Sequence, residues 1–318
     1  MSVNQTDILD LAPEKDAITL RAPAKINLSL VVLAPRPDGY HDLHSLMGTV
    51  DLFDDLRIRR TDSGGIRLGC SGIPSPDGPE NLVVKAAKRL AEQIGREPQL
   101  EITLHKRIPA GGGLGGASSD AAATLVGLNR LWQAGLSVKE LHHLAAGLGS
   151  DVPFFLYAPL ALCTGRGEIV RPLPSRCRRA LLLIFPSVSV STAAVYHEYD
   201  YEHHRAEEQL AQIRDRLDAG DIDGLLELNI NSLAPVTARL FPEIAAVRER
   251  LAQAGIGPVH QSGSGSTLFV MGSPGQVAAW GQLLRELSLP AATARFLTSN
   301  RMANFSAEVL HANLGNQG

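Results

Sequence analysis

The sequence is poor in the features that mark secreted, metal-binding and membrane-spanning proteins. Its three cysteines, Cys70, Cys163 and Cys177, show no CxxC spacing and no nearby histidine pair, so neither a disulfide framework nor a zinc site is predicted. The longest uninterrupted apolar run covers only residues 180–185, whereas a membrane-spanning helix needs about 20. Residues 1–17 are polar and acidic, unlike a signal or transit peptide. We therefore expect a soluble, cytoplasmic protein.

An excess of charge of one sign is also lacking. The 30 Lys and Arg residues oppose 33 Asp and Glu residues, for a net charge of −3. No general basic field would attract nucleic acid, so we expect neither a nucleic-acid nor a membrane partner, and the sequence is silent on protein partners. Lysine is scarce, with 6 residues against 24 arginines, which makes a lysine inside a motif informative.

The 318 residues predict roughly two domains at about 150 residues each. We expect an N-terminal extension at 1–17, a first domain at 18–170 and a second at 171–318. Strands are predicted near 18–23, 25–33, 56–60, 99–109, 180–186 and 266–272, and helices near 81–95, 117–132, 137–147, 205–219, 242–254 and 275–287. Mixed strands and helices without strict βαβ alternation predict two α+β domains.

The strongest motif is the glycine-rich segment at 109–120, which lies between a predicted strand and a predicted helix. Glycine lets a backbone approach a ligand closely, and the free N–H groups of a helix N-terminus attract anions. The segment therefore predicts a phosphate site, with a flexible hinge as the alternative. It is no P-loop, because no lysine follows the glycines. A dinucleotide-binding site is disfavoured, because no acidic strand end follows about 20 residues later.

Three weaker signals are spread along the chain. Lys25 lies within an apolar strand, where burial requires an anionic partner, although an edge lysine that reaches solvent is the alternative. Asp151 follows a glycine and a serine before an apolar run, and an Asx turn or helix cap is the favoured explanation of this segment taken alone. The small-residue loop at 261–267 could be another ligand loop or a simple β-turn.

The order of these segments resembles that of the GHMP kinase superfamily. The stretches AKINL (24–28), DGYH (38–41), GGGLGGASSDAAA (111–123) and GSDVPFF (149–155) most resemble its branch that uses ATP and Mg²⁺ to phosphorylate the 2-hydroxyl of 4-diphosphocytidyl-2-C-methyl-D-erythritol, in the non-mevalonate route to isoprenoids. The resemblance implies an α+β fold: an N-terminal α/β domain, a ferredoxin-like C-terminal domain and an active site in the cleft between them.

The resemblance also implies roles for individual residues. Asp151 would be the general base near the attacking hydroxyl, and Lys25 would keep Asp151 ionised and stabilise charge on the transferred oxygens. Ser119 would contact the metal. Asn81 and Lys106 would contact adenosine, with a helix cap and an exposed strand lysine as the alternatives. The ATP phosphates would lie against Pro109, Ala110, Gly111, Gly112, Gly113, Leu114, Gly115, Gly116, Ala117, Ser118 and Ser119.

For the cytidyl substrate, the resemblance implies stacking of cytosine between Tyr40 and Tyr196, with His41 reading its polar edge and Thr192 nearby. Asn27 would hydrogen-bond the substrate close to Lys25. The sequence departs from the family pattern in the second domain, at Ser232, Ala234 and Ser266.

Two rival functions are retained. A mevalonate- or homoserine-type GHMP kinase is disfavoured by the DGYH segment, and a catalytically silent sensor of the same fold is disfavoured by the presence of both Lys25 and Asp151. A nucleic-acid-binding protein has only the arginine-rich stretch at 171–179 in its favour.

Overall fold

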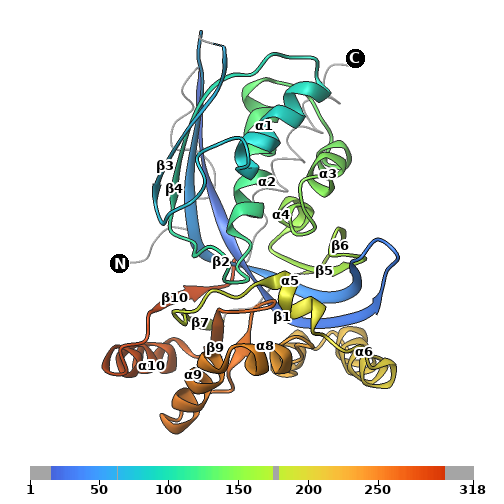
Figure 1. The fold of residues 1–318 in the computed structure, drawn as a ribbon, viewed down its shortest axis with the longest axis vertical. Helices are drawn as coiled ribbons and strands as arrows, with labels where there is room; N and C mark the ends of the chain where they lie inside the picture. The colour runs from blue at the N-terminus through green and yellow to red at the C-terminus, as the bar shows by residue number, and fades with distance from the viewer. Residues whose placement is uncertain (1–15, 63, 175–178, 298–318) are drawn as a thin grey trace.

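The computed structural model describes residues 16–62, 64–174 and 179–297, which form two β-sheets with helices packed against them (Figure 1). The first sheet has the strand order β3-β4-β2-β5-β6, and β1 pairs with β2 outside this path. Its strands are β1 (Ala17–Pro35), β2 (His41–Arg60), β3 (Gly65–Gly72), β4 (Gln99–Lys106), β5 (Leu160–Thr164) and β6 (Ile169–Pro172).

Four helices lie on one face of the first sheet, as Figure 1 shows. They are α1 (Leu82–Gln93), α2 (Gly116–Leu131), α3 (Val138–Ala146) and α4 (Val152–Tyr157). Helix α2 is buried on nearly all sides, because it packs between the sheet and the neighbouring helices. Its own glycine makes this possible: a Cβ on Gly127 would lie 2.4 Å from Leu20 Cδ1 of β1.

The second sheet has the order β10-β7-β9-β8 and is antiparallel throughout. Its strands are β7 (Ala180–Ile184), β8 (His260–Gln261), β9 (Leu268–Gly272) and β10 (Ala291–Arg295). The accompanying helices are α5 (Thr192–His197), α6 (His203–Asp218), α7 (Ile222–Glu227), α8 (Ala234–Leu240), α9 (Pro242–Gln253) and α10 (Pro274–Glu286).

The two sheets share hydrophobic core, so they are not independent bodies. Ala24, Ile26 and Leu28 of β1 belong to the same buried cluster as Leu181 of β7 and Phe269 of β9. Backbone bridges join Leu30 to Asn231 and Val50 to Phe296 across the same junction. The residues of β1 that carry the AKINL motif therefore lie where the two halves of the molecule meet.

The expected two-domain α+β architecture is confirmed, and the predicted helices and most strands are present within a few residues of their expected ends. The capping box at Ser137 and Glu140 is formed. The two strands expected at 18–23 and 25–33 are one continuous strand, β1, because register shifts at Pro23/Ala24 and Asn27/Ser29 accommodate the irregularity within the pairing. Strand β4 is antiparallel to β2, as expected for an amphipathic strand, but parallel to β3.

Residues 1–15 of the expected extension, Cys177, and residues 298–318 of the expected second domain lie outside the described residues. Ala17, assigned to the extension, is the first residue of β1. The chain passes from the first sheet to the second between Pro172 and Ala180. Of the three cysteines, Cys70 and Cys163 are described, and both are free thiols.

Candidate active site

The structure brings Lys25 and Asp151 into contact at the junction of the two halves. Lys25 Nζ lies 3.2 Å from Asp151 Oδ2 and donates a 2.6 Å hydrogen bond to Asn27 Oδ1. Lys25 and Asn27 are two residues apart on β1, so their side chains point to the same face of the strand. Asn27 Nδ2 in turn donates to Ser45 Oγ at 2.8 Å, which fixes the amide so that its oxygen faces the ammonium.

The alternatives considered for these two residues do not hold. Lys25 is 3% exposed, so it is no edge lysine reaching solvent. Asp151 occupies the N-cap position of α4, but its side chain makes no cap hydrogen bond. The carboxylate instead faces Lys25 while its side chain stays 32% exposed. One buried cation thus holds a carboxylate that remains accessible to a small molecule.

The glycine-rich segment forms the loop between β4 and α2. Gly111, Gly113 and Gly115 have positive φ angles of 68°, 75° and 67°, which side chains on L-residues rarely adopt. A Cβ on Gly115 would lie 2.9 Å from Lys25 Cγ, and Lys25 N donates to Leu114 O at 2.9 Å. The loop therefore runs directly past the Lys25–Asp151 pair and ends at the N-terminus of α2, a position that attracts anions.

The small-residue loop at 261–267 packs against this glycine loop from the second domain. Ser262 Oγ donates to Gly113 O at 2.8 Å and accepts from Asn27 N at 3.2 Å. Thr267 N donates to Gly112 O at 3.2 Å, and a Cβ on Gly113 would lie 2.1 Å from Ser262 O. The segment contains the expected turn, closed by Gly265 N, which donates to Ser262 O at 2.9 Å, and it also braces the glycine loop. The sequence does not identify Ser262 and Thr267 as individual site residues, because their contacts with the glycine loop depend on the fold.

The side chains of Asn81 and Lys106 both contact other groups of the protein. Asn81 caps α1, because its side chain accepts a hydrogen bond from Val83 N. The alternative given for Lys106, an exposed strand lysine, is wrong: Lys106 is 5% exposed, because even-numbered positions of β4 face the core. Its ammonium contacts the carboxylates of Asp54 and Asp120, so the buried charge is already paired within the protein.

The two serines at the start of α2 differ in exposure. Ser118 is half-buried, whereas Ser119 is fully buried, and the Ser119 hydroxyl has no hydrogen-bond partner among the described residues. Nowhere in residues 16–62, 64–174 and 179–297 does a group of three or more His, Cys, Asp or Glu side chains form a site that could hold a metal ion. A metal here would need ligands from a bound molecule as well.

A cluster of aromatic rings follows the DGYH turn. The turn is closed by Arg36 N, which donates to Tyr40 O at 2.7 Å, and Gly39 has a φ of 83°. Tyr40 is 54% exposed, and the Arg166 guanidinium lies 4.9 Å from its ring centroid. Burial lowers the pKa of His41, so its ring is mainly neutral at pH 7 and can both donate and accept hydrogen bonds.

The structure places Tyr196 near the DGYH turn, with its ring 5.7 Å from that of His41. Burial raises the pKa of the Tyr196 phenol, which keeps it protonated. Tyr199, which sequence reasoning missed, is edge-on to His41 at 6.2 Å and donates to Val32 O. Thr192 Oγ1 lies 2.8 Å from Ser264 Oγ, which joins α5 to the 261–267 loop.

Three positions of the second domain, Ser232, Ala234 and Ser266, depart from the family pattern, and the structure shows where each lies. Ser232 Oγ accepts from Val32 N and donates to Gln209 Oε1, both at 3.2 Å, so this serine ties the second domain to β1. Ala234 is the first residue of α8, and Ser266 is buried in the brace loop. His142 packs edge-on against Tyr157 at 5.6 Å.

Comparison with known proteins places these features in a family. The family profile described as GHMP kinases N terminal domain matches residues 81–158, and GHMP kinases C terminal matches residues 206–283. The chain is 43% identical over 270 residues to the 4-diphosphocytidyl-2-C-methyl-D-erythritol kinase of Moorella thermoacetica, covering 83% of this chain and 93% of that protein.

Comparison with solved structures indicates the same family. A crystal structure of 4-(cytidine 5'-diphospho)-2C-methyl-D-erythritol kinase matches with a TM-score of 0.70 and 34% identity, over 88% of this chain and 99% of that one. A homoserine kinase from Cytophaga hutchinsonii matches with a TM-score of 0.73 over 92% of this chain and 98% of that one, but at 22% identity it shares only the fold. No helix in the described part of the chain is long and apolar enough to cross a membrane.

Proposed function

The chain belongs to the 4-diphosphocytidyl-2-C-methyl-D-erythritol kinases of the GHMP family and phosphorylates the 2-hydroxyl of that compound with ATP in the non-mevalonate route to isoprenoids; we propose that Lys25 and Asp151 perform the transfer. The observation that carries this assignment is the contact of a buried ammonium with a partly exposed carboxylate beside a glycine loop. Phosphoryl transfer depends mainly on positioning and on electrostatic stabilisation, and this arrangement supplies both.

Asp151 accepts the hydrogen bond of the attacking hydroxyl, orients its oxygen and takes its proton late in the transfer. Lys25 cannot swing away, because burial, Asn27 Oδ1 and Asp151 hold its ammonium in one place. A cation fixed in advance stabilises charge on the transferred oxygens without reorganising during the reaction. Asn27 positions Lys25 through its Oδ1 atom and hydrogen-bonds the substrate beside it.

The glycine loop binds the ATP phosphates through its backbone N–H groups. Residues 109–119 turn from β4 into α2, whose N-terminus carries roughly half a positive charge. The brace loop holds the middle of this segment through Ser262 and Thr267. The terminal phosphate is thereby brought beside Lys25, since Gly115 packs against that side chain.

The cytidyl end of the substrate is bound by the aromatic cluster. Tyr40 presents an exposed ring for stacking. His41, the next residue along the chain, lies with its ring 5.7 Å from that of Tyr196. Stacking on a base is worth about 1–3 kcal/mol, and a neutral imidazole edge adds hydrogen-bonding selectivity. Mevalonate and homoserine have no base to stack, so the cluster favours the cytidyl substrate over those of other GHMP kinases.

Mg²⁺ fits the donor set only as a metal shared with the nucleotide. The Ser119 hydroxyl, which has no hydrogen-bond partner among the described residues, and the Asp151 carboxylate are oxygen donors of the hard type that Mg²⁺ prefers, and nucleotide phosphates would complete its coordination. When bound, the ion neutralises phosphate charge.

One assay tests the function. Purified protein is incubated with ATP, Mg²⁺ and the cytidyl substrate, and ADP and the 2-phosphate product are measured, with mevalonate and homoserine in parallel. We expect turnover of the cytidyl substrate alone. Turnover of homoserine or mevalonate instead would indicate a different GHMP kinase, and nucleotide binding without any turnover would indicate a sensor.

A further inference from the structure

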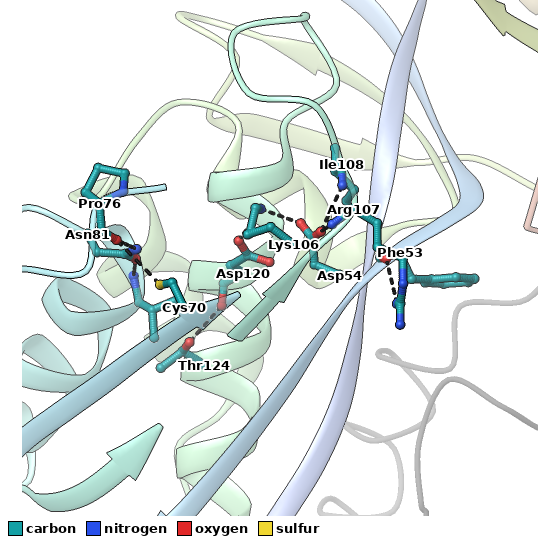
Figure 2. A network of polar contacts seen from close by, with 11 residues as sticks. Phe53, Asp54, Cys70, Pro76, Asn81, Lys106, Arg107, Ile108, Asp120 and Thr124 are labelled. Atoms are coloured by element: carbon teal, nitrogen blue, oxygen red, sulfur yellow. Dashed lines mark hydrogen bonds and ion pairs between the residues drawn. The ribbon is translucent and has the colours of Figure 1, made fainter. Parts of the chain in front are cut away.

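A buried cluster of three charged side chains lies against both ends of the glycine loop, and it includes neither Lys25 nor Asp151. Lys106 Nζ contacts a carboxylate oxygen of Asp54 and lies 2.6 Å from Asp120 Oδ2 (Figure 2). Lys106, Asp54 and Asp120 are 5%, 0% and 2% exposed. They come from β4, β2 and α2, so the cluster joins three separate elements of the first domain.

The cluster touches the beginning of the glycine loop through Asp54. Its Oδ1 accepts hydrogen bonds from Arg107 N at 2.5 Å and Ile108 N at 2.9 Å, while its Oδ2 faces Lys106. Arg107 and Ile108 are the first residues after β4 and directly precede Pro109. Figure 2 shows both backbone contacts converging on this one carboxylate. Asp54 therefore sets where the chain leaves the sheet.

The cluster touches the end of the loop through Asp120, which lies in the first turns of α2. A Cβ on Gly116, the first residue of that helix, would lie 3.2 Å from Lys106 Nζ and 2.9 Å from Ile108 Cγ2. The start and the end of the loop are thus packed against each other over the Lys106 ammonium. Movement of β4 relative to α2 would pull at least one ion pair apart.

Burying three charged groups costs folding free energy unless they are well paired. One ammonium faces two carboxylates, and burying unbalanced charge is unfavourable. Burial opposes the Lys106 ammonium, but the contacts with Asp120 and Asp54 outweigh it, so the pKa of Lys106 is raised.

We propose that Asp54, Lys106 and Asp120 are positioning residues that hold both ends of the glycine loop at the separation required to bind the ATP phosphates. The proposal rests on the proposed role of that loop and assigns no contact with ATP to the three side chains. The three residues affect the binding of ATP and not that of the cytidyl substrate, because Tyr40 and His41, which bind cytidine, belong to a different turn, between β1 and β2.

The test compares Asp54→Asn and Asp120→Asn with Asp55→Asn as a matched control. Asp55 is the neighbour of Asp54 on β2, but it pairs on the exposed side with the Arg107 side chain. We expect the KM for ATP and the Kd for ADP, measured calorimetrically, to rise about tenfold in Asp54→Asn, as for loss of a buried charged hydrogen bond. The KM for the cytidyl substrate should change less than twofold, and Asp55→Asn should resemble the wild type.

Equal changes in both KM values, or a lower melting temperature with unchanged ATP and ADP binding, would overturn the proposal. Asp120→Asn retains an oxygen for Lys106 and the volume of the side chain, so it provides a folded variant should Asp54→Asn fail to fold. Its expected rise in the Kd for ADP is smaller, about threefold, and no rise at all would count against the cluster. Wild-type turnover of the cytidyl substrate separately tests the function, and ADP binding does not depend on that result.

Discussion

The ammonium of Lys25 and the carboxylate of Asp151 are in contact at 3.2 Å but differ in exposure, at 4% and 32% of their side chains. The cation is sealed between β1 and the glycine loop, whereas the carboxylate keeps a surface that a substrate hydroxyl can reach. This asymmetry agrees with the roles proposed above, a fixed charge at Lys25 and a proton acceptor at Asp151.

Replacing Asp151 by asparagine should lower kcat by about 10²–10⁴-fold, the range of a lost general base. The amide has nearly the same shape and remains beside Lys25, so the Kd for ADP should stay within about twofold of the wild type. Single-turnover kinetics with the cytidyl substrate and calorimetry with ADP measure the two quantities. Near wild-type turnover would show that Asp151 is not the base.

Tyr40→Ala should raise the KM for the cytidyl substrate about tenfold, because one stacking partner of the base is lost. Tyr40→Phe is the matched control, since it retains the ring and removes only the hydroxyl, and it should behave like the wild type. The KM for ATP should be unaffected in both variants. Steady-state kinetics at varied concentrations of each substrate tests this, and an unchanged KM in Tyr40→Ala would remove the ring from the cytidine site.

Gly113→Ala should disable the phosphate loop. The new Cβ would lie 2.1 Å from Ser262 O, and the φ angle of 75° is itself unfavourable for alanine. Because the obstacle is backbone of the brace loop, the glycine loop must move, and we expect the KM for ATP to rise at least about tenfold. Gly275→Ala, in α10 with nothing near its Cβ, is the control and should leave activity unchanged. Wild-type kinetics in Gly113→Ala would mean that the two loops need not touch.

Asp120 should make the stability of the protein fall as pH rises. The pKa of Asp120 is raised by burial from its ordinary 3.8 to about 7 in the folded state. Between these values the folded protein holds a proton that the unfolded chain has released, so the stabilisation is complete below pH 3.8 and is lost as pH rises through about 7. The slope is at most about 1.4 kcal/mol per pH unit. Asp120→Asn cannot titrate there and lacks this contribution.

Urea denaturation of the wild type and Asp120→Asn at pH 5, 6, 7 and 8 measures this effect. Other titrating groups cancel in the difference between the two proteins. The free energy of unfolding of the wild type should fall relative to that of the variant between pH 5 and 7 and level off above. Parallel curves would show that Asp120 is ionised throughout.

Much of the active site could be predicted because local chemistry fixes it. Five glycines around a helix start favour positive φ angles, found here at Gly111, Gly113 and Gly115, and a close approach of the backbone, and no tertiary contact is needed to recognise that. The motifs around Lys25, Tyr40 and Asp151 are short and continuous, so their order along the chain was enough to indicate the family. Lys106 could have been recognised as buried from its register alone, since it shares the parity of Leu100, Ile102 and Leu104 on β4.

Contacts between segments remote in sequence could not be predicted. Nothing in a pair of adjacent aspartates tells that Asp54 faces the core and Asp55 the exposed surface, because the register of β2 against β4 decides it. The Ser262 brace and the ring of Tyr199 beside His41 depend in the same way on how the second domain packs against β1. Amino-acid identity thus established which chemical groups are available, while the packing of the two domains determined which groups meet, because hydrogen bonds and ion pairs depend on distances of a few ångströms that no spacing along the chain specifies.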